Sequence, residues 1–133
     1  MKLAIQINGH PASSMAATTA YQFIKAALRK DHQVILVFFY YDGVFSRLVP
    51  AHTEAETAAA VAPPDWAALV SEYGLDLVIC SAAAERRGLA ALSPAAASDL
   101  MRTAAPVGAF RAGGLGQWVD ACLRCDRFIV FAS

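Results

Sequence analysis

Residues 33–41, QVILVFFYY, form the stretch of sequence that decides the fold. Almost every side chain in it is β-branched, aromatic or otherwise apolar, and the run ends at Asp42-Gly43. A strand with one face in water alternates apolar and polar residues, whereas a strand covered on both faces is apolar throughout. The stretch therefore predicts a central strand of a parallel sheet.

Strand-like and helix-like segments alternate on both sides of this run. Further strands are expected at residues 2–8, 75–80, 106–110 and 127–132, and helices at 13–30, 65–74, from 82 onward, at 93–103 and at 114–125. Such alternation is typical of an α/β protein. We expect a three-layer α/β/α sandwich around a mostly parallel sheet of about five strands. No repeat or long linker divides the chain, so residues 1–133 should form a single domain.

Several residues predict where the helices begin and which faces they bury. Ser13 or Ser14 is the expected N-cap of the first helix, and Asp65 and Gly74 should cap the second. The expected buried face of the first helix comprises Ala16, Ala20, Phe23, Ala27 and Leu28. Residues 44–64 show no strong periodicity and predict a long connection, with a helical turn or two near 54–60.

The composition is 57% hydrophobic and 17% charged, against about 25% charged residues in an average globular protein. A sheet buried on both faces and an apolar subunit interface would together explain this excess. No apolar run reaches the roughly 18 residues of a membrane helix, and the first residues do not resemble a signal peptide. The net charge is zero, with no basic block. We therefore expect a cytoplasmic protein that binds neither membrane nor nucleic acid directly.

In open α/β sheets, functional sites lie beyond the carboxyl ends of the strands. The segments expected there are residues 8–10, 40–42, 80–81 and 110–111. Cys80 is the one cysteine of the three that follows a predicted strand in this way. The odd number of cysteines and the expected location argue against a disulfide framework.

Cys80 is either a small core residue or a reactive thiol. Its position before a helix would favour the thiolate, and the small residues 81–84 should leave the sulfur accessible. Arg86 and Arg87 would add positive potential, although an arginine pair often forms a solvated helix face. His10, at the end of the first strand, could act as a base or ion-pair partner, or have neither role.

Two further motifs have a structural and a functional interpretation. Cys122 and Cys125 form a C-x-x-C, but they come at the end of a predicted helix, where the dipole opposes a thiolate. Zinc would need two more ligands, so no metal is expected. Residues 113–116, GGLG, could bind an anion through backbone N–H groups, but a tight turn that lets a helix approach the sheet is preferred.

Five segments in order resemble the DsrE/TusD family of sulfur-relay subunits. They are AYQF at 20–23, VFFYYDGV at 37–44, ICSAAAERRG at 79–88, GGLG at 113–116 and CDRFIVF at 125–131. The resemblance covers nearly the whole chain, and its most specific parts are the segments at 37–44 and 79–88.

The resemblance implies a DsrE-like α/β fold and a sulfurtransferase subunit that carries sulfur as a persulfide on Cys80. It implies donor and acceptor proteins of a relay that serves tRNA 2-thiouridine synthesis or sulfur oxidation, and no cofactor. It also implies assembly with related small subunits, or with itself. Cys122 does not belong to the pattern. The alternatives are a non-catalytic oligomeric scaffold or sensor, and a thiol oxidoreductase that uses Cys122 and Cys125.

Overall fold

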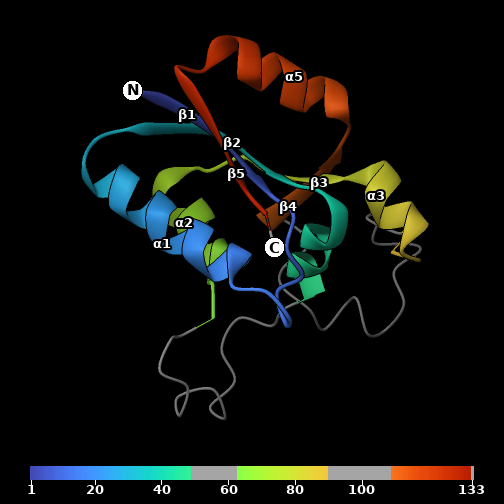
Figure 1. The fold of residues 1–133 in the computed structure, drawn as a ribbon. Helices are drawn as coiled ribbons and strands as arrows, with labels where there is room; N and C mark the ends of the chain where they lie inside the picture. Colours follow the sequence, from blue (N-terminus) through green and yellow to red (C-terminus); the bar gives the residue numbers. More distant parts are fainter. Residues whose placement is uncertain (49–62, 90–108, 133) are drawn as a thin grey trace.

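The computed structural model describes residues 1–48, 63–89 and 109–132 (Figure 1). Its strands form one sheet in the order β4-β3-β2-β1-β5, and every neighbouring pair is parallel. The elements in chain order are β1 Lys2–Ile7, α1 Ala16–Arg29, β2 Gln33–Phe39, η1 Tyr41–Leu48, α2 Trp66–Tyr73, β3 Leu77–Cys80, α3 Ser81–Arg86, β4 Phe110–Gly113, α5 Leu115–Arg124 and β5 Arg127–Phe131. The helical segments expected at 54–60 and 93–103 lie outside the described residues.

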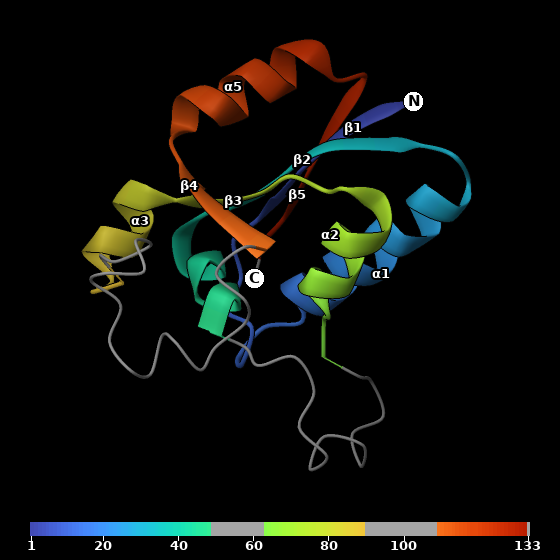
Figure 2. The same ribbon diagram turned by 180° about the vertical axis from the view of Figure 1, so that it is seen from behind.

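The helices lie on both faces of the sheet, which confirms the three-layer sandwich. Helices α1 and α2 cover one face and α5 covers the other, as Figures 1 and 2 show from opposite sides. Helix α3 continues directly from the carboxyl end of β3 and contacts the 3₁₀ helix η1. The sheet order places β2 and β1 in the interior and β4 and β5 at the edges.

Strand β2 is buried from both sides, as its sequence predicts. Phe38 stacks on Trp118 of α5, with ring centroids 5.9 Å apart. The next residue, Phe39, points to the other face and meets Trp66 of α2 edge-on at 5.2 Å. Because successive side chains of a strand point to opposite faces, these two aromatic contacts join the sheet to both helical layers.

Helix α1 differs from the prediction at its start and in its rotation. Met15 occupies the N-cap position without a side-chain hydrogen bond, while the Ser14 hydroxyl accepts a hydrogen bond from the Ala16 N–H at 3.1 Å. Phe23 was expected in the core but is 37% exposed. The helix instead buries Tyr21 and Ile24, and the Tyr21 ring packs edge-on against Trp66.

Helix α2 has the two caps that the sequence predicts. The Asp65 carboxylate accepts a hydrogen bond from the Ala68 N–H at 3.1 Å. At the other end, Gly74 adopts a left-handed conformation with φ 68°, and its N–H donates to the Val70 carbonyl. Both ends of this helix were therefore predictable from local chemistry.

Two segments correct the sequence prediction. The fourth strand runs over Phe110–Gly113, so it begins where the predicted strand at 106–110 ends. Residues 41–48 form the 3₁₀ helix η1, whereas the sequence predicted an irregular connection from residue 44. A short 3₁₀ helix lacks the 3.6-residue apolar period by which α-helices are found.

Candidate functional site

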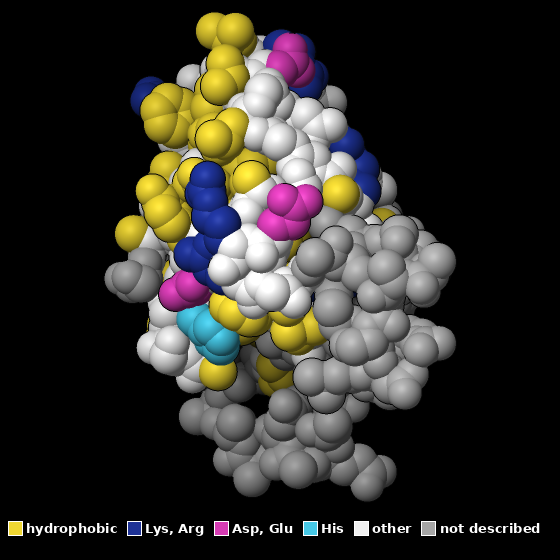
Figure 3. All heavy atoms as spheres, turned by 90° about the vertical axis from the view of Figure 1, so that its right-hand side faces the viewer, with side chains coloured by type: hydrophobic (Ala, Val, Ile, Leu, Met, Phe, Trp, Pro, Cys, Tyr) yellow, Lys and Arg dark blue, Asp and Glu magenta, His cyan; other side chains and the backbone are white. Residues whose placement is uncertain are grey.

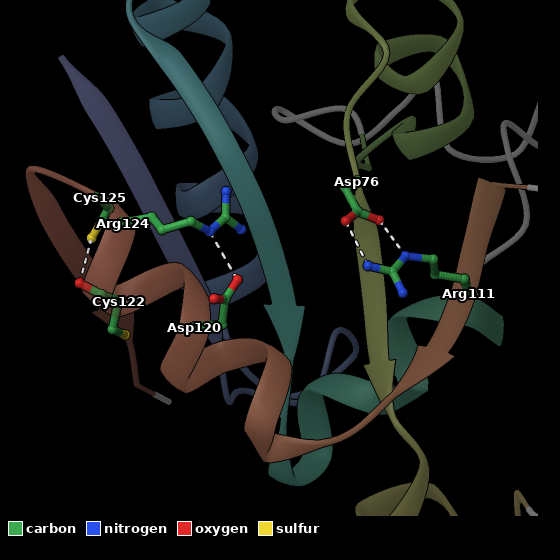
Figure 4. A network of polar contacts seen from close by, with 6 residues as sticks. All are labelled: Asp76, Arg111, Asp120, Cys122, Arg124 and Cys125. Atoms are coloured by element: carbon green, nitrogen blue, oxygen red, sulfur yellow. Dashed lines mark hydrogen bonds and ion pairs between the residues drawn. The ribbon is translucent and has the colours of Figure 1, made fainter.

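The carboxyl ends of β1, β2 and β3 meet at one edge of the sheet, because the strands are parallel neighbours. This edge carries residues 8–10, 40–42 and 80–81, as predicted. The fourth predicted segment is elsewhere, since Arg111 is the second residue of β4. Its guanidinium donates two hydrogen bonds, of 2.6 and 2.7 Å, to Asp76, just before β3 begins (Figure 4). The hydrogen bond to Asp76 raises the pKa of Arg111, so this arginine is a structural cation.

A polar hollow of about 360 Å³ lies at this edge. It contains two of the predicted site residues, His10 after β1 and Arg87 after α3. Its full lining is Asn8, Gly9, His10, Ser13, Ser14, Tyr41, Asp42, Arg87 and Ala132. The hollow is therefore built from the segments that follow β1, β2 and β5, together with the end of α3. Cys80 and Arg86 are not part of its lining.

Arg87 connects α3 to the segment after β2. Its Nε donates to Asp42 Oδ1 at 2.7 Å, and its Nη1 donates to the Ala83 carbonyl at 3.1 Å. The Arg87 side chain is 23% exposed and that of Asp42 is 56% exposed. Such a pair contributes about 1 kcal/mol or less to stability, so its main effect is positional. Arg86, by contrast, is exposed.

His10 is held by one hydrogen bond and one ring contact. Its Nδ1 accepts a hydrogen bond from the Ala12 N–H at 3.0 Å, so the neutral ring carries its proton on Nε2. The ring centroid is 4.8 Å from that of Phe45. The His10 ring is half-buried, and in its neutral form the Nε2–H is the group that can donate a hydrogen bond.

The segment after β2 holds Asp42 in place through unusual backbone geometry. Tyr41 has φ 47°, which is uncommon for a residue with a side chain. The N–H of Gly43 donates to the carbonyls of Asn8 and Tyr40, at 3.1 and 2.9 Å. A Cβ at Gly43 would collide with the Ile7 carbonyl, so only glycine allows the ends of β1 and β2 to approach this closely.

Cys80 is the last residue of β3 and the N-cap residue of α3. The N–H groups of the first helical turn, which have no partner within a helix, follow it directly. Cys80 pairs with Gly113 of β4, and the next hydroxyl, that of Ser81, donates to the Gly113 carbonyl at 3.1 Å. The prediction that the Cys80 sulfur is accessible was wrong. Cys80 is only 1% exposed, because strands on both sides and the start of α3 enclose it.

This burial predicts the order in which the thiols react with iodoacetamide. Cys125 is half-buried and should be alkylated first, whereas Cys80 should react at least about tenfold more slowly in the folded chain. Peptide mass spectrometry after timed quenching measures the order. Labelling in denaturant, where all three thiols are exposed, provides the control. Equal native rates for Cys80 and Cys125 would contradict the buried position of Cys80.

Cys122 and Cys125 lie at the carboxyl end of α5, as predicted (Figure 4). The Cys125 thiol donates to the Cys122 carbonyl at 3.4 Å, and both side chains are half-buried. Burial, and then the neighbouring Cys125, raise the pKa of Cys122. These conditions disfavour the thiolate that a C-x-x-C oxidoreductase needs.

Within residues 1–48, 63–89 and 109–132, no group of three or more His, Cys, Asp or Glu side chains is arranged to hold a metal ion. No helix of that part of the chain is both long and apolar enough to span a membrane. Of the GGLG glycines, only Gly113 allows the close helix–sheet packing that the sequence favoured, since a Cβ at Gly114 or Gly116 would meet no atom within 4 Å. A Cβ at Gly113 would approach Val78 Cγ1 to 2.6 Å and would collide with the Gln117 side chain.

Sequence reasoning did not select several residues of this edge. Residues 40–42 were predicted to lie at this edge, but Tyr41 and Asp42 were given no role there, because nothing in the sequence indicates the ion pair with Arg87. Arg47 in η1 is 3% exposed, and burial lowers its pKa. Its burial has no sequence signal, because arginine is mostly found on surfaces.

The sequence profile of the DsrE/DsrF-like family matches residues 1–131. The chain belongs to the DsrE/DsrF-like family. The match extends over all the described strands, so it covers Cys80 and every lining residue of the hollow except Ala132.

Individual relatives agree over their full length. DsrE of Allochromatium vinosum is 41% identical over 141 residues, covering 100% of both chains. A sulfurtransferase TusD homologue of Pseudomonas aeruginosa is 39% identical over 137 residues, covering 100% of this chain and 98% of the relative. The crystal structure of YchN from Escherichia coli superposes with a TM-score of 0.71 over 98% of this chain and 99% of that one. At 15% identity, that similarity supports the fold alone.

Proposed function

We propose that this chain is a sulfurtransferase subunit that accepts sulfane sulfur on Cys80 as a persulfide and passes it to another protein of a sulfur relay. The observation that carries the proposal is the position of Cys80. It is the one cysteine at the carboxyl edge of the parallel sheet, and it opens the helix that leads to Arg87 in the polar hollow. Relatives of similar length are named sulfurtransferases.

The reaction is a pair of thiol exchanges that needs no net oxidant. The Cys80 thiolate attacks the outer sulfur of a donor persulfide, the donor S–S bond breaks, and the donor leaves as a thiolate. Cys80 then carries the extra sulfur as a persulfide. An acceptor thiolate attacks that outer sulfur, and the bond to Cys80 breaks and restores the Cys80 thiolate. Sulfur is moved without a change in the total number of S–S bonds.

The surroundings of Cys80 suit an anionic sulfur that is shielded between transfers. Cys80 is the N-cap residue of α3, so the N–H groups and the positive end of the helix dipole face its sulfur. Arg86 and Arg87 lie at the other end of α3, and His10 lies in the hollow. Because Cys80 is buried, sulfur transfer requires α3 to move when a donor or acceptor docks. The Arg87–Asp42 pair, which ties α3 to η1, is the contact that such a movement would release.

The remaining features of the proposal concern context. The whole chain, residues 1–133, would act as one domain in the cytoplasm, without a cofactor. Its partners would be the donor and acceptor proteins, and related subunits or further copies of itself. The relay would serve either tRNA 2-thiouridine synthesis or sulfur oxidation.

A double variant tests whether Cys80 suffices. Cys122→Ser with Cys125→Ser leaves Cys80 as the single thiol of the chain. After incubation with a polysulfide donor and removal of excess reagent, intact mass should increase by one sulfur atom, and a reductant should remove it. A double variant that gains no sulfur, while the wild type does, would reject Cys80 as the carrier.

A second candidate is a non-catalytic scaffold or sensor, which the burial of Cys80 favours. It predicts that Cys80→Ser leaves assembly and cellular role intact. The third candidate, an oxidoreductase using Cys122 and Cys125, has less support because burial raises the pKa of Cys122. A reversible Cys122–Cys125 disulfide detected by thiol trapping, with Cys80 inert, would favour it.

A further inference from the structure

The polar hollow at the carboxyl edge of the sheet contains several unused hydrogen-bond donors. Its volume of about 360 Å³ is within the range of small-ligand sites. Figure 3 shows the molecule from the side on which α3 lies in Figure 1, and histidine, acidic and basic side chains are seen there close to one another. The donors belong to four of the lining residues: Asn8, His10, Ser14 and Arg87.

The side-chain amide of Asn8 is oriented by Gln6. Gln6 Nε2 donates to Asn8 Oδ1 at 2.8 Å, so the amide oxygen of Asn8 is engaged and its NH2 group remains as the donor. The main chain of Asn8 is fixed as well, because its N–H donates to the Phe131 carbonyl and its carbonyl accepts from the Gly43 N–H. Asn8 therefore presents its NH2 group from a fixed position directly after β1.

His10 and Ser14 are oriented in the same way, each by a backbone N–H group. His10 Nδ1 accepts from the Ala12 N–H at 3.0 Å, which leaves the Nε2–H as the donor of the neutral ring. The Ser14 hydroxyl accepts from the Ala16 N–H at 3.1 Å, which leaves its O–H to donate. In both side chains an acceptor position is occupied and a donor remains.

Arg87 supplies the positive charge of the hollow and is held in two directions. Its Nε donates to Asp42 Oδ1 at 2.7 Å, and its Nη1 donates to the Ala83 carbonyl at 3.1 Å. A guanidinium has five N–H donors, so those of Nη2 remain. Among the described residues that line the hollow, Asp42 is the one acid, and Arg87 already balances its charge. The hollow therefore lacks the excess of carboxylates that a cation site would need.

The remaining donors share one chemical preference. Within residues 1–48, 63–89 and 109–132, the NH2 group of Asn8, the Nε2–H of His10 and the Nη2 group of Arg87 have no acceptor. Hydrogen bonds from such donors to a charged oxygen are about twice as strong as those to a neutral one. A group with several negatively charged oxygens would satisfy these donors together.

We propose that this hollow binds a small oxyanion through the donors of Asn8, His10 and Arg87. The Ser14 hydroxyl is a fourth donor at the same site. The ligand is a carboxylate or a sulfur oxyanion, because either one presents two or more oxygens to donors that come from different segments of the chain. The planar fork of the Arg87 guanidinium matches a pair of such oxygens, and Arg87 also offsets the repulsion from Asp42.

The bound oxyanion would lie beside α3. The Arg87 guanidinium reaches back to the Ala83 carbonyl, which is about one helical turn from Cys80. A small sulfur donor that carries a carboxylate or sulfonate group would thus be held next to the helix that Cys80 opens. This consequence rests on the proposed persulfide function. Oxyanion binding itself does not, so the two proposals can fail separately.

NMR titration of the isotope-labelled full chain tests the site. The probes are sodium sulfate and sodium acetate, each compared with sodium chloride at equal ionic strength, which removes the effect of charge screening. The side-chain signals of Asn8 and Arg87 should shift and saturate, with a dissociation constant on the order of 1–10 mM. Saturation by sulfate alone supports a sulfur oxyanion as the ligand, and saturation by acetate alone supports a carboxylate. If neither probe saturates by about 100 mM, the proposal is overturned.

Asn8→Asp tests whether the amide donor holds the oxyanion. The substitution keeps the oxygen that accepts from Gln6 but replaces the NH2 group by a carboxylate oxygen, so it should weaken binding at least about tenfold. Gln22→Glu is the matched control, because it makes the same change of charge at an exposed position of α1 outside the hollow. It should leave the dissociation constant within about twofold of the wild type.

Arg87→Gln tests the charged donor in the same titration. Binding should again weaken at least about tenfold, whereas Arg29→Gln, which removes an exposed arginine at the end of α1, should have little effect. Circular dichroism verifies that all four variants are folded. Equal affinities of the wild type, Asn8→Asp and Arg87→Gln would show that the anion binds elsewhere, which overturns the proposal.

Discussion

Replacing Cys80 by serine is expected to lower the rate of sulfur transfer from a persulfide donor to an acceptor thiol at least ~10³-fold. Serine retains the size of the side chain but not the nucleophilic sulfur, and it cannot hold a persulfide. A single-turnover assay with labelled sulfane sulfur measures the rate.

The control variants are Cys122→Ser and Cys125→Ser, which should each retain transfer within a fewfold of the wild type. Their side chains lie at the carboxyl end of α5, whereas Cys80 lies at the carboxyl end of β3. Wild-type rates in Cys80→Ser would contradict the proposed carrier. Loss of transfer in Cys122→Ser alone would point to the C-x-x-C instead.

Replacing Gly43 by alanine is expected to lower the free energy of unfolding by about 3 kcal/mol. The new Cβ would collide with the Ile7 carbonyl oxygen and would lie 2.9 Å from the Ile7 carbonyl carbon. Both atoms belong to the backbone at the end of β1, which cannot rotate away as a side chain could. Urea unfolding followed by circular dichroism measures the change.

Gly116→Ala is the matched control for this substitution. A Cβ at Gly116 has no atom within 4 Å, and the residue lies inside α5. Alanine should therefore leave stability unchanged or raise it by about 0.5–1 kcal/mol, because it favours the helix. An unchanged urea midpoint for Gly43→Ala would show that β1 and η1 are not tightly packed.

The parts of the fold that local chemistry determines were predictable. The apolar run of β2 indicated burial on both faces, and Phe38 and Phe39 do contact helices on opposite sides. Asp65 and Gly74 marked the ends of α2. Strand β4 was misplaced because FRAG contains an arginine and two small residues, and only Phe110 of it is buried.

Properties that depend on neighbours were not predictable. The sequence predicts β5 as a strand but not its place in the sheet; the sheet order makes it an edge strand and leaves Phe128 and Val130 exposed. Phe23 was assigned to the core from its helical spacing. That assignment failed because the rotation of α1 depends on contacts with other elements, such as that of Tyr21 with Trp66.

The candidate site was predicted only in part, because some of its features also depend on neighbouring elements. Strand ends indicated that His10 and Cys80 share an edge, since parallel strands align their carboxyl ends. The ion pair between Arg87 and Asp42, and the burial of Cys80, depend on how α3 packs against η1. The small residues after Cys80 suggested access to the sulfur, but they allow close packing equally well.

The central claim is that sulfur resides on Cys80 during transfer. The most direct test is to load the wild-type chain with a persulfide donor, trap it with an alkylating reagent in denaturant, and locate the extra sulfur by tandem mass spectrometry of its peptides. We predict an alkylated persulfide on the peptide that contains Cys80. Extra sulfur found only on the peptide that contains Cys122 and Cys125 would contradict the account.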